Sequence, residues 1–309
     1  MKQVCFGVDI GGTTVKLGLV SREGELLDKR EFPSFRDLGA TFDDIADHMR
    51  QVMEDFRSMG GVSDEYQCVG AGVGVPGPVV DQSRVVHCAN LGWKNVDIAQ
   101  ELSSRAGVPI RVANDANLAA LGEAWQGGGK GCRNLVMLTV GTGIGGGIIC
   151  DGKIIAGATG AGGEVGHMPV PFHTDWQCGC GRKGCLEVTA SATGIIRAAR
   201  QFSPFKEMDK VTAKDVYDAA AAGDKNAVAV VAESSAALGY AAAAISCVVN
   251  PEVILLGGGV SAAGRALLDP VEAAFKAYAF SSCAGAKFAL AQLGNNAGIY
   301  GGAALFFTE

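Results

Sequence analysis

One short segment holds four side chains that can bind a metal ion together. His167 precedes a Cys-x-Cys-x4-Cys run formed by Cys178, Cys180 and Cys185. Imidazole nitrogen and thiolate sulfur are ligands that Zn2+ prefers, and four of them usually close a structural site. Glycines between the cysteines permit turns tight enough to aim several sulfurs at one point. The segment therefore predicts a structural zinc site.

Other roles for these cysteines fit the pattern less well. Buried core cysteines or a disulfide pair would not require three cysteines and a histidine at this spacing. A catalytic zinc usually has three protein ligands and a water, whereas four candidates are present here. A zinc ribbon would show two Cys-x2-Cys pairs, which the segment lacks.

Two carboxylates flank the predicted metal site. Glu164 and Glu187 could accept hydrogen bonds from adjacent hydroxyls, and the second ring nitrogen of His167 could bond a ligand hydroxyl. Alone, each glutamate could be a solvated surface acid, and Glu187 a favourable charge at a helix N-terminus. Their shared position favours a polar pocket for a molecule with several hydroxyls, such as a hexose.

Asn114 and Asp115 follow a short apolar run, residues 110–113, which reads as a strand. Ligands of α/β proteins bind at the carboxyl ends of strands. Asp115 is therefore the best candidate for a general base; it is a weak base, but phosphoryl transfer mainly requires a positioned hydroxyl. Alternatively, Asn114 and Asp115 could serve as the N-cap of the following helix. The two roles are compatible if Asn114 caps the helix and Asp115 faces the ligand.

The turn Asp9–Thr14 joins two apolar runs, residues 4–10 and 15–20, in a predicted hairpin. Its backbone N–H groups and threonine hydroxyls could cradle phosphate oxygens. Asp9 could hold a hydrated Mg2+, and Lys16 could approach the phosphates. The alternative is a hairpin turn without a ligand.

A second glycine turn, Gly141–Gly147, could bind phosphate in the same way. It contains G-x-G-x-x-G but opens a strand instead of a helix, so we reject a Rossmann fingerprint. Gly258 and Gly259 follow another apolar strand and could lie against adenine and ribose.

Alternating strands and helices must position these residues. The sequence contains the same pattern twice: a strand hairpin followed by alternating strands and helices. This repetition suggests two related α/β halves. We expect Thr41 to open the first helix, with Asp44 as its capping-box partner. The remaining expected strands are 25–32, 68–75, 134–141, 147–149, 153–155, 252–257 and 287–293, and the expected helices are 97–106, 116–125, 190–202, 212–222, 225–248, 264–278 and 296–307.

Composition narrows the class of protein. The chain has 309 residues, 48% of them hydrophobic, and a net charge of −6, which gives no support for nucleic-acid binding. No signal peptide is apparent, and the apolar run 227–249 reads as a buried helix, so we expect no membrane span. We therefore place the chain in the cytoplasm, where its ten cysteines stay reduced.

Taken together, these motifs resemble the ROK family of sugar kinases and repressors, within the actin-like ATPase superfamily. The resemblance covers essentially the whole chain. Its motifs are Asp9–Thr13, Gly74–Pro78, Asn90–Trp93, Asn114–Asn117, Gly141–Gly146, Gly163–His167 and Cys178–Cys185.

The resemblance implies an α/β, two-domain actin-like ATPase (ribonuclease H-like) fold with an interdomain cleft. The small domain would span 1–115 and be completed by helix 296–309, and the large domain, 116–295, would hold the zinc loop. The implied roles are as follows: Gly11, Gly12, Thr13, Thr142 and Gly143 at the ATP phosphates; Gly258 and Gly259 near adenosine; Asp115 as catalytic base; Asn90, Asn114, Asp115, Glu164, His167 and Glu187 at the sugar; and His167, Cys178, Cys180 and Cys185 at zinc.

The implied activity is an ATP- and Mg2+-dependent hexose kinase acting on the 6-hydroxyl of glucose. The stretch Glu187–Gly194 is similar to the bacterial glucokinases of the family. Kinases for N-acetylmannosamine, fructose or allose share the same polar set, and a non-enzymatic sugar sensor is a further alternative. The first strand starts at Val4, so we expect no DNA-binding domain. Helices 225–248 and 264–278 could pack between subunits or belong to the core, and we expect a homodimer.

Overall fold

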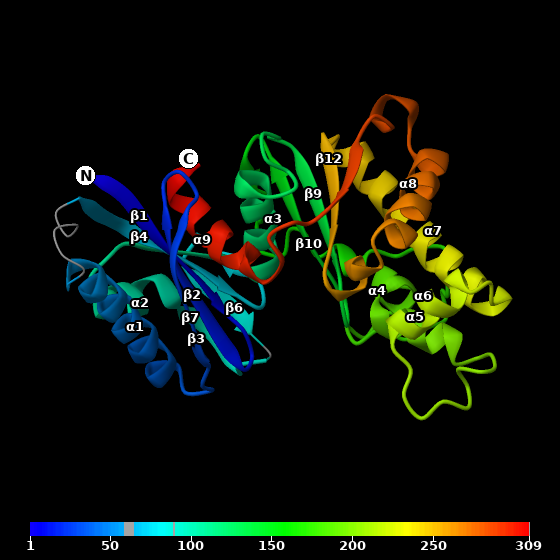
Figure 1. Cartoon of the computed structure of the whole chain (residues 1–309), viewed down its shortest axis with the longest axis horizontal. Helices are drawn as coiled ribbons and strands as arrows, with labels where there is room; N and C mark the ends of the chain where they lie inside the picture. The colour runs from blue at the N-terminus through cyan, green and yellow to red at the C-terminus, as the bar shows by residue number, and fades with distance from the viewer. Residues whose placement is uncertain (59–64, 89, 309) are drawn as a thin grey trace. The chain divides into compact units, whose positions relative to one another are not determined.

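The computed structural model describes residues 1–58, 65–88 and 90–308. Its internal contacts form two compact units (Figure 1). Unit 1 comprises Met1–Gly131, Gly147–Gly162 and Asn295–Glu309, and unit 2 comprises Cys132–Gly146 and Gly163–Gly294.

Unit 1 is built on a five-stranded sheet with the order β3-β2-β1-β4-β8. Strands β1 (Lys2–Ile10), β2 (Thr14–Ser21) and β3 (Leu26–Pro33) pair antiparallel, which confirms the predicted hairpin. Strands β4 (Tyr66–Val75) and β8 (Ile110–Asn114) continue the sheet in parallel with β1. The carboxyl ends of β1, β4 and β8 therefore meet at one edge.

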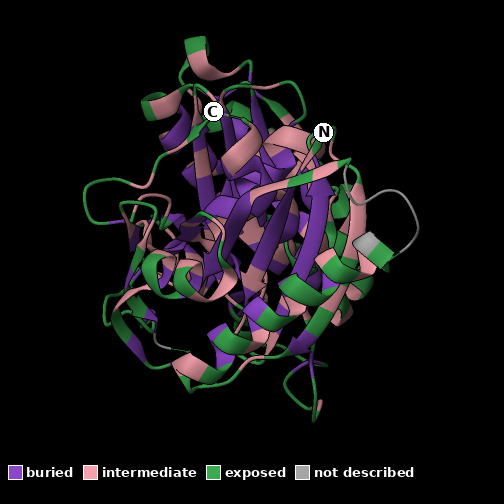
Figure 2. Cartoon of the chain, turned by 90° about the vertical axis from the view of Figure 1, so that its left-hand side faces the viewer, coloured by how far each residue is buried: buried purple, intermediate pink, exposed green. Residues whose placement is uncertain are grey.

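One face of this sheet packs against two helices. Alternate β1 side chains, Val4, Phe6 and Val8, join a core that also contains residues of α1 (Leu38–Ser58) and α2 (Ile98–Ala106). Figure 2 looks onto unit 1 and shows its central strands largely buried. Successive side chains of a strand point to opposite faces, so Val4, Phe6 and Val8 share one face, and the continuous burial from Val4 to Val8 shows that both faces of β1 are covered.

The opposite face accepts helix α9 (Ala297–Phe307) at very short range. A Cβ added to Gly7 of β1 would lie 1.8 Å from the carbonyl oxygen of Ile299. A Cβ added to Gly72 of β4 would lie 2.0 Å from that of Gly302. The sheet therefore needs glycine on this face, because any side chain would hold α9 away.

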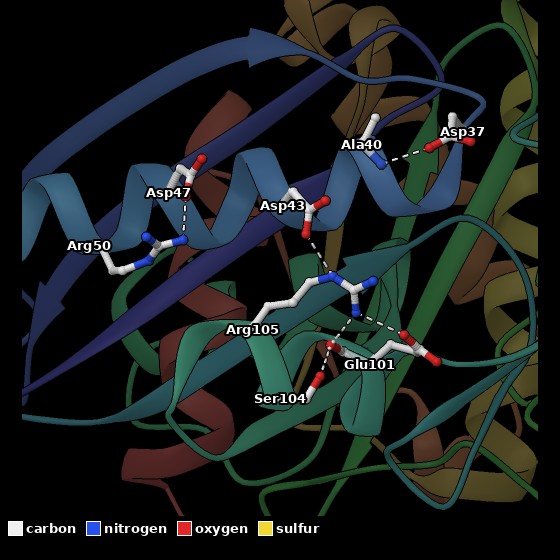
Figure 3. A network of polar contacts seen from close by, with 8 residues as sticks. All are labelled: Asp37, Ala40, Asp43, Asp47, Arg50, Glu101, Ser104 and Arg105. Carbon is white, nitrogen blue, oxygen red and sulfur yellow. Dashed lines mark hydrogen bonds and ion pairs between the residues drawn. The ribbon is translucent and has the colours of Figure 1, made fainter.

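Ion pairs join α1 and α2 at the surface (Figure 3). Arg105 of α2 donates to Asp43 of α1 and to the Glu101 carboxylate, each at 2.8 Å. Both acids are exposed, so the network contributes little stability and mainly fixes how the two helices align.

The expected start of the first helix was wrong. Helix α1 begins at Leu38, three residues before Thr41. The Asp37 carboxylate accepts from the Ala40 N–H at 2.7 Å, while the Thr41 hydroxyl bonds the backbone N–H and C=O of Phe35. The cap is thus supplied by the aspartate, because the threonine hydroxyl is already engaged by the preceding loop.

A small sheet in unit 1 had no counterpart in the sequence prediction. Strands β5 (Val79–Val80), β6 (Arg84–Cys88) and β7 (Trp93–Asp97) pair antiparallel in that order.

The predicted hairpin around Asp151 and Gly152 is confirmed, since the two residues have φ of 52° and 78° and join β10 (Ile144–Cys150) to β11 (Lys153–Ile154).

Unit 2 repeats the parallel arrangement. Strands β9 (Leu135–Val140), β12 (Val253–Gly257) and β13 (Lys287–Leu290) run parallel in that order, and β10 begins beside β9. The triple corresponds to β1-β4-β8 of unit 1. Their carboxyl ends again form a single edge that can present loops to a ligand.

Helices make up most of the rest of unit 2. The predicted helix 190–202 is observed as the shorter α5 (Ala192–Ala199), which begins after Ser191 because that side chain caps it by accepting from the Gly194 N–H, while a separate short helix, α4 (Leu186–Ala190), precedes it. The described helices are α4 (Leu186–Ala190), α5 (Ala192–Ala199), α6 (Ala213–Ala221), α7 (Lys225–Val249) and α8 (Arg265–Tyr278), with 3-10 turns η1 (Val165–His167), η2 (Gly259–Ala263), η3 (Ser281–Cys283) and η4 (Gly294–Asn296), the last of which runs into unit 1.

Among the described helices, α7 has the length and apolar composition of a membrane span. A core helix passes the same test, and 56% of the apolar window of α7 is buried within the protein. Gly239 lets α8 approach closely, since an added Cβ would lie 2.5 Å from the Cβ of Ala274. This packing agrees with the expected buried helix.

The compact units differ from the predicted domain limits. The sequence prediction began the large domain at residue 116, but α3 (Asp115–Gln126) packs against α9 and belongs to unit 1. A Cβ on Gly301 of α9 would lie 1.8 Å from the carbonyl oxygen of Leu118. Backbone packing at this range holds α3 and α9 together in unit 1. The predicted domain limits, 1–115 with 296–309 and 116–295, stay a prediction.

We predict that Gly72→Ala destabilises the protein by at least about 2 kcal/mol, because the new methyl group meets backbone that cannot move cheaply. Thermal unfolding followed by circular dichroism checks this. Gly285→Ala is the matched control, since an added Cβ there meets nothing within 4 Å. Equal midpoints for the two variants would contradict the close-packing account.

Candidate functional site

The edge of the unit 1 sheet brings several predicted site residues together. Asp9 lies opposite Gly74 across the β1–β4 pair, and Val75 lies opposite Asn114 across the β4–β8 pair. The loops that follow these strands therefore emerge side by side. This is the position at which α/β sheets bind ligands.

The first glycine turn is a hairpin turn with exposed backbone. The Gly11 N–H donates to the Thr14 carbonyl at 2.9 Å, and both Gly12 and Thr13 are exposed. Lys16 Nζ lies 3.6 Å from Asp9 Oδ2. Burial raises the pKa of Asp9, and the ammonium of Lys16 partly opposes that rise. A bound cation could replace the Lys16 ammonium as the partner of the Asp9 carboxylate.

Asn114 forms the N-cap of α3. Its Oδ1 accepts from the N–H groups of Ala116 at 2.9 Å and Asn117 at 3.1 Å, and its Nδ2 donates to the Gly77 carbonyl at 3.3 Å. Asp115 is the first residue of the helix, and its Oδ1 accepts from the Ala116 N–H at 2.9 Å. A carboxylate is favourable in the first turn of a helix, and this contact fixes the position of the Asp115 side chain at the start of α3.

Asn90 lies near the first glycine turn. It is exposed, and its Cβ would be 3.5 Å from a Cβ added to Gly12. Unit 1 thus gathers two groups of predicted residues: the phosphate turn with Asn90, and the cap with Asp115.

In unit 2, the second glycine turn and the predicted adenosine glycines follow neighbouring parallel strands. Thr142 and Gly143 follow β9, and Gly258 and Gly259 follow β12. Gly258 has φ of 81°, and an added Cβ would lie 2.5 Å from the Val140 carbonyl oxygen. The two loops therefore lie against each other, with Thr142, Gly258 and Gly259 exposed.

Glu187 has a role that the sequence prediction missed. Its Oε2 accepts from the backbone N–H of Ile144 at 2.9 Å, and a Cβ added to Gly143 would lie 2.2 Å from the same oxygen. The carboxylate thus holds the end of the glycine turn. The other side of the turn is held by Thr193, whose hydroxyl donates to the Thr142 carbonyl at 2.8 Å.

The four predicted metal ligands form one cluster. The ligand atoms of His167, Cys178, Cys180 and Cys185 all lie within 4.8 Å of one another. Cys180 Sγ and Cys185 Sγ are 3.7 Å apart, and Cys178 Sγ is 3.6 Å from His167 Nδ1. Two sulfurs on a tetrahedral zinc with bonds of about 2.3 Å would be separated by about 3.8 Å. The cluster therefore fits a single metal ion.

Short backbone turns produce this geometry. The Cys178 N–H donates to the Arg182 carbonyl at 2.8 Å, and the Gly181 N–H donates to the Cys178 carbonyl at 3.0 Å. Gly181 and Gly184 have φ of 88° and 69°, which a residue with a side chain rarely adopts. The glycines predicted to permit tight turns are therefore needed here.

The thiols differ in their readiness to ionise. The backbone N–H of Arg182 and then the Cys178 thiol lower the pKa of the Cys180 thiol to about 6. Burial raises the pKa of the Cys185 thiol to about 12. Cys180 can thus offer a thiolate near neutral pH, whereas Cys185 ionises only when a cation stabilises its thiolate.

A stack of side chains supports the metal loop, and the sequence prediction missed it. The His173 ring stacks on Trp176 at a centroid distance of 3.7 Å, and the guanidinium of Arg197 lies 4.1 Å from the Trp176 ring centroid. His173 Nε2 also lies 3.0 Å from Glu233 of α7. The only signal in the sequence was that His173 and Trp176 closely precede Cys178.

His167 and Glu164 lie together before the cluster. His167 ends the turn η1, and its N–H donates to the Glu164 carbonyl at 3.2 Å. Glu164 is exposed. Unit 2 thus brings the metal ligands, both predicted sugar glutamates and the second phosphate turn into one connected region.

We predict that Cys178→Ser lowers the bound metal well below one ion per chain, because a neutral hydroxyl is a poor substitute for a thiolate. Elemental mass spectrometry of the purified protein measures this. Cys247→Ser is the matched control, since Cys247 is exposed and outside the cluster. Equal metal content in the two variants would refute the ligand set.

The chain was compared with known proteins. A family model described as "ROK family" matches residues 5–309. Glucokinase of Halalkalibacterium halodurans is 42% identical over 96% of this chain and 92% of its own, and glucokinase of Thermotoga maritima is 36% identical over 97% and 96%.

Solved structures agree with this. A ROK family glucokinase from Streptomyces griseus in complex with glucose and AMPPNP has a TM-score of 0.74 and 31% identity over 98% of both chains. The likeness to ROK kinase structures confirms the predicted actin-like ATPase fold class. The match along nearly the whole sequence settles the family: this chain belongs to the ROK family.

Proposed function

We propose that this protein is an ATP-dependent glucose kinase, which transfers the γ-phosphoryl group of ATP to the 6-hydroxyl of glucose. The observation that carries the proposal is the similarity to glucokinases along nearly the entire chain. The geometry of each unit agrees with the activity, since both present glycine turns and polar side chains at the carboxyl edge of a parallel sheet.

Asp115 would be the general base. It would accept the proton of the attacking hydroxyl as the bond to phosphorus forms. Its placement in the first turn of α3 supports this role, because the capped helix end holds the carboxylate in a fixed position. Phosphoryl transfer depends more on such positioning than on the strength of the base.

The sugar would be held by six polar side chains. Asn90, Asn114, Asp115, Glu164, His167 and Glu187 supply the acceptors and donors that a hexose needs. Hydrogen-bonding groups that a bound sugar covers reject analogues that lack a hydroxyl, because the protein group is then left without a partner. Two of these residues, Asn114 and Glu187, also hold backbone in place, so the sugar ligands would be preorganised.

The glycine turns would bind ATP. Backbone N–H groups at Gly11, Gly12 and Gly143, with the hydroxyls of Thr13 and Thr142, would receive phosphate oxygens. Lys16 would lie near the phosphates, and Gly258 and Gly259 would lie near adenosine. Asp9 is the residue that would hold Mg2+, which when bound neutralises charge on the phosphates.

The Cys/His cluster would hold a structural Zn2+. Four protein ligands leave no open position for a substrate water, which argues against a catalytic metal. The ion would anchor His167 and, through Cys185, the start of α4 that carries Glu187. We extend the proposal to a homodimer that acts in the cytoplasm, in central carbohydrate metabolism.

Other functions have less support. Kinases for N-acetylmannosamine, fructose or allose would use the same catalytic set with different contacts to the sugar. A non-enzymatic sensor would not require Asp115 at the end of β8 together with two glycine turns.

The proposal is tested by ADP release with Mg-ATP and a panel of glucose, mannose, fructose, allose, N-acetylglucosamine and N-acetylmannosamine. We expect a kcat/KM for glucose at least about tenfold above the others. Preference for another sugar would refute glucose as the substrate. If zinc-replete protein turned over none of the sugars, the proposed kinase activity itself would be refuted.

We further predict that Asp115→Asn lowers kcat by about 10^2–10^4-fold while the protein still binds glucose, because only the proton acceptor is removed. Steady-state kinetics and calorimetry separate the two effects. Asp218→Asn is the control, since Asp218 is exposed and pairs with Lys214 on the surface of α6. Turnover near that of the unchanged protein would exclude Asp115 as the base.

A further inference from the structure

Unit 1 contains a cavity of about 350 Å³ outside the groups described above. All residues that line it belong to unit 1, and Asn114 is the only predicted site residue among them. The Asn114 side chain is already engaged by the cap of α3 and by Gly77. The cavity is therefore not explained by the proposed sugar or nucleotide contacts.

The cavity is formed by segments that are far apart in the sequence. They are the strand β5 and its turn, the edge strand β8, one face of α3, the β10–β11 hairpin with the loop after it, and the end of α9. Its walls are mainly apolar: Val79, Val112, Leu121 and Leu305 are each at most 5% exposed. Small-molecule sites have this character, with volumes from about 300 Å³ upward.

One buried polar atom in this wall lacks a partner. Asn117 lines the cavity and is only 2% exposed. Its Nδ2 reaches the Gly162 carbonyl at 3.5 Å, while its Oδ1 has no hydrogen bond within the described part of the chain. A buried carbonyl oxygen without a donor is unfavourable, and native proteins rarely leave one unpaired.

These two features together define the chemistry of an occupant. The buried apolar part of the wall, which includes Val79, Val112 and Leu121, favours a hydrocarbon body. The Asn117 oxygen requires one N–H or O–H donor. Asp81 and Lys153, both exposed, also line the cavity. Their charges are opposite, so the lining carries no net charge that would favour an ionic ligand.

We propose that this cavity is a binding site for a small neutral molecule with an apolar body and a single N–H or O–H donor, which bonds the Oδ1 of Asn117. The inference does not rest on the kinase activity, because the site lies within unit 1 and is tested by binding alone. Asn117 and Leu121 are one helical turn apart on α3, so the donor and the apolar body would contact the same helix face.

The test uses two probes of one shape. Indole carries an N–H donor, and indene has the same fused rings without it. Calorimetry and ligand-observed NMR on the full chain, without ATP or sugar, should show indole binding at least tenfold more tightly than indene. No detectable indole binding, or equal binding of the two probes, would overturn the proposal.

Matched variants locate the site. Ile154 lines the cavity, whereas the neighbouring Ile155 does not and is 39% exposed. Ile154→Trp should abolish indole binding, and Ile155→Trp should leave it unchanged. Asn117→Leu should remove the preference for indole over indene. Asn117 is buried, so the Asn117→Leu variant could fail to fold, and the Ile154 and Ile155 variants would then locate the site without it. Retained indole binding in Ile154→Trp would show that the probe binds elsewhere and would overturn the proposal.

Discussion

One hydrogen bond joins the second glycine turn to the helix that follows the Cys/His cluster: the Ile144 N–H donates to the Glu187 carboxylate at 2.9 Å. Gly143 must lack a side chain for that carboxylate to approach. Glu187 lies two residues after Cys185, which is both a metal-cluster thiol and the N-cap residue of α4. The position of the turn therefore depends on where the cluster fixes the start of that helix.

In unit 1, too, a candidate ligand-binding side chain holds local backbone in place. Asn114 closes the amino end of α3 and thereby holds Asp115 at the edge where β1, β4 and β8 end. Glycines at positions 7 and 72 let α9 press on the other face of this sheet, so the strands that carry the edge are fixed from both sides. In both units a polar side chain that could bind ligand also holds local backbone in place.

Features encoded locally were predictable. Runs of alternating or continuous apolar residues gave the strands, and the cluster ligands lie within a short stretch of chain, so their types and spacing already define a metal site. The N-cap at Asn114 was likewise visible, because capping depends only on the next few residues.

Features that depend on distant contacts were not predictable. The bond between Glu187 and Ile144 joins residues 43 apart, and nothing near either one signals it. Gly7 and Gly72 look like ordinary strand residues until their approach to α9 is known. Strands β5 to β7 were missed because they are short and partly exposed, so their apolar pattern is weak. The stack on Trp176 brings in Arg197 from another helix, which no local pattern specifies.

We expect the Cys/His cluster to position the second glycine turn through α4 and Glu187, and that turn to contact the ATP of the proposed reaction. The most direct test measures the affinity of a non-hydrolysable ATP analogue by calorimetry before metal removal, after it, and after zinc is restored, with circular dichroism as a check that the protein stays folded. The account predicts that affinity falls when the metal is removed and returns with zinc. Unchanged affinity in folded, metal-free protein would contradict it.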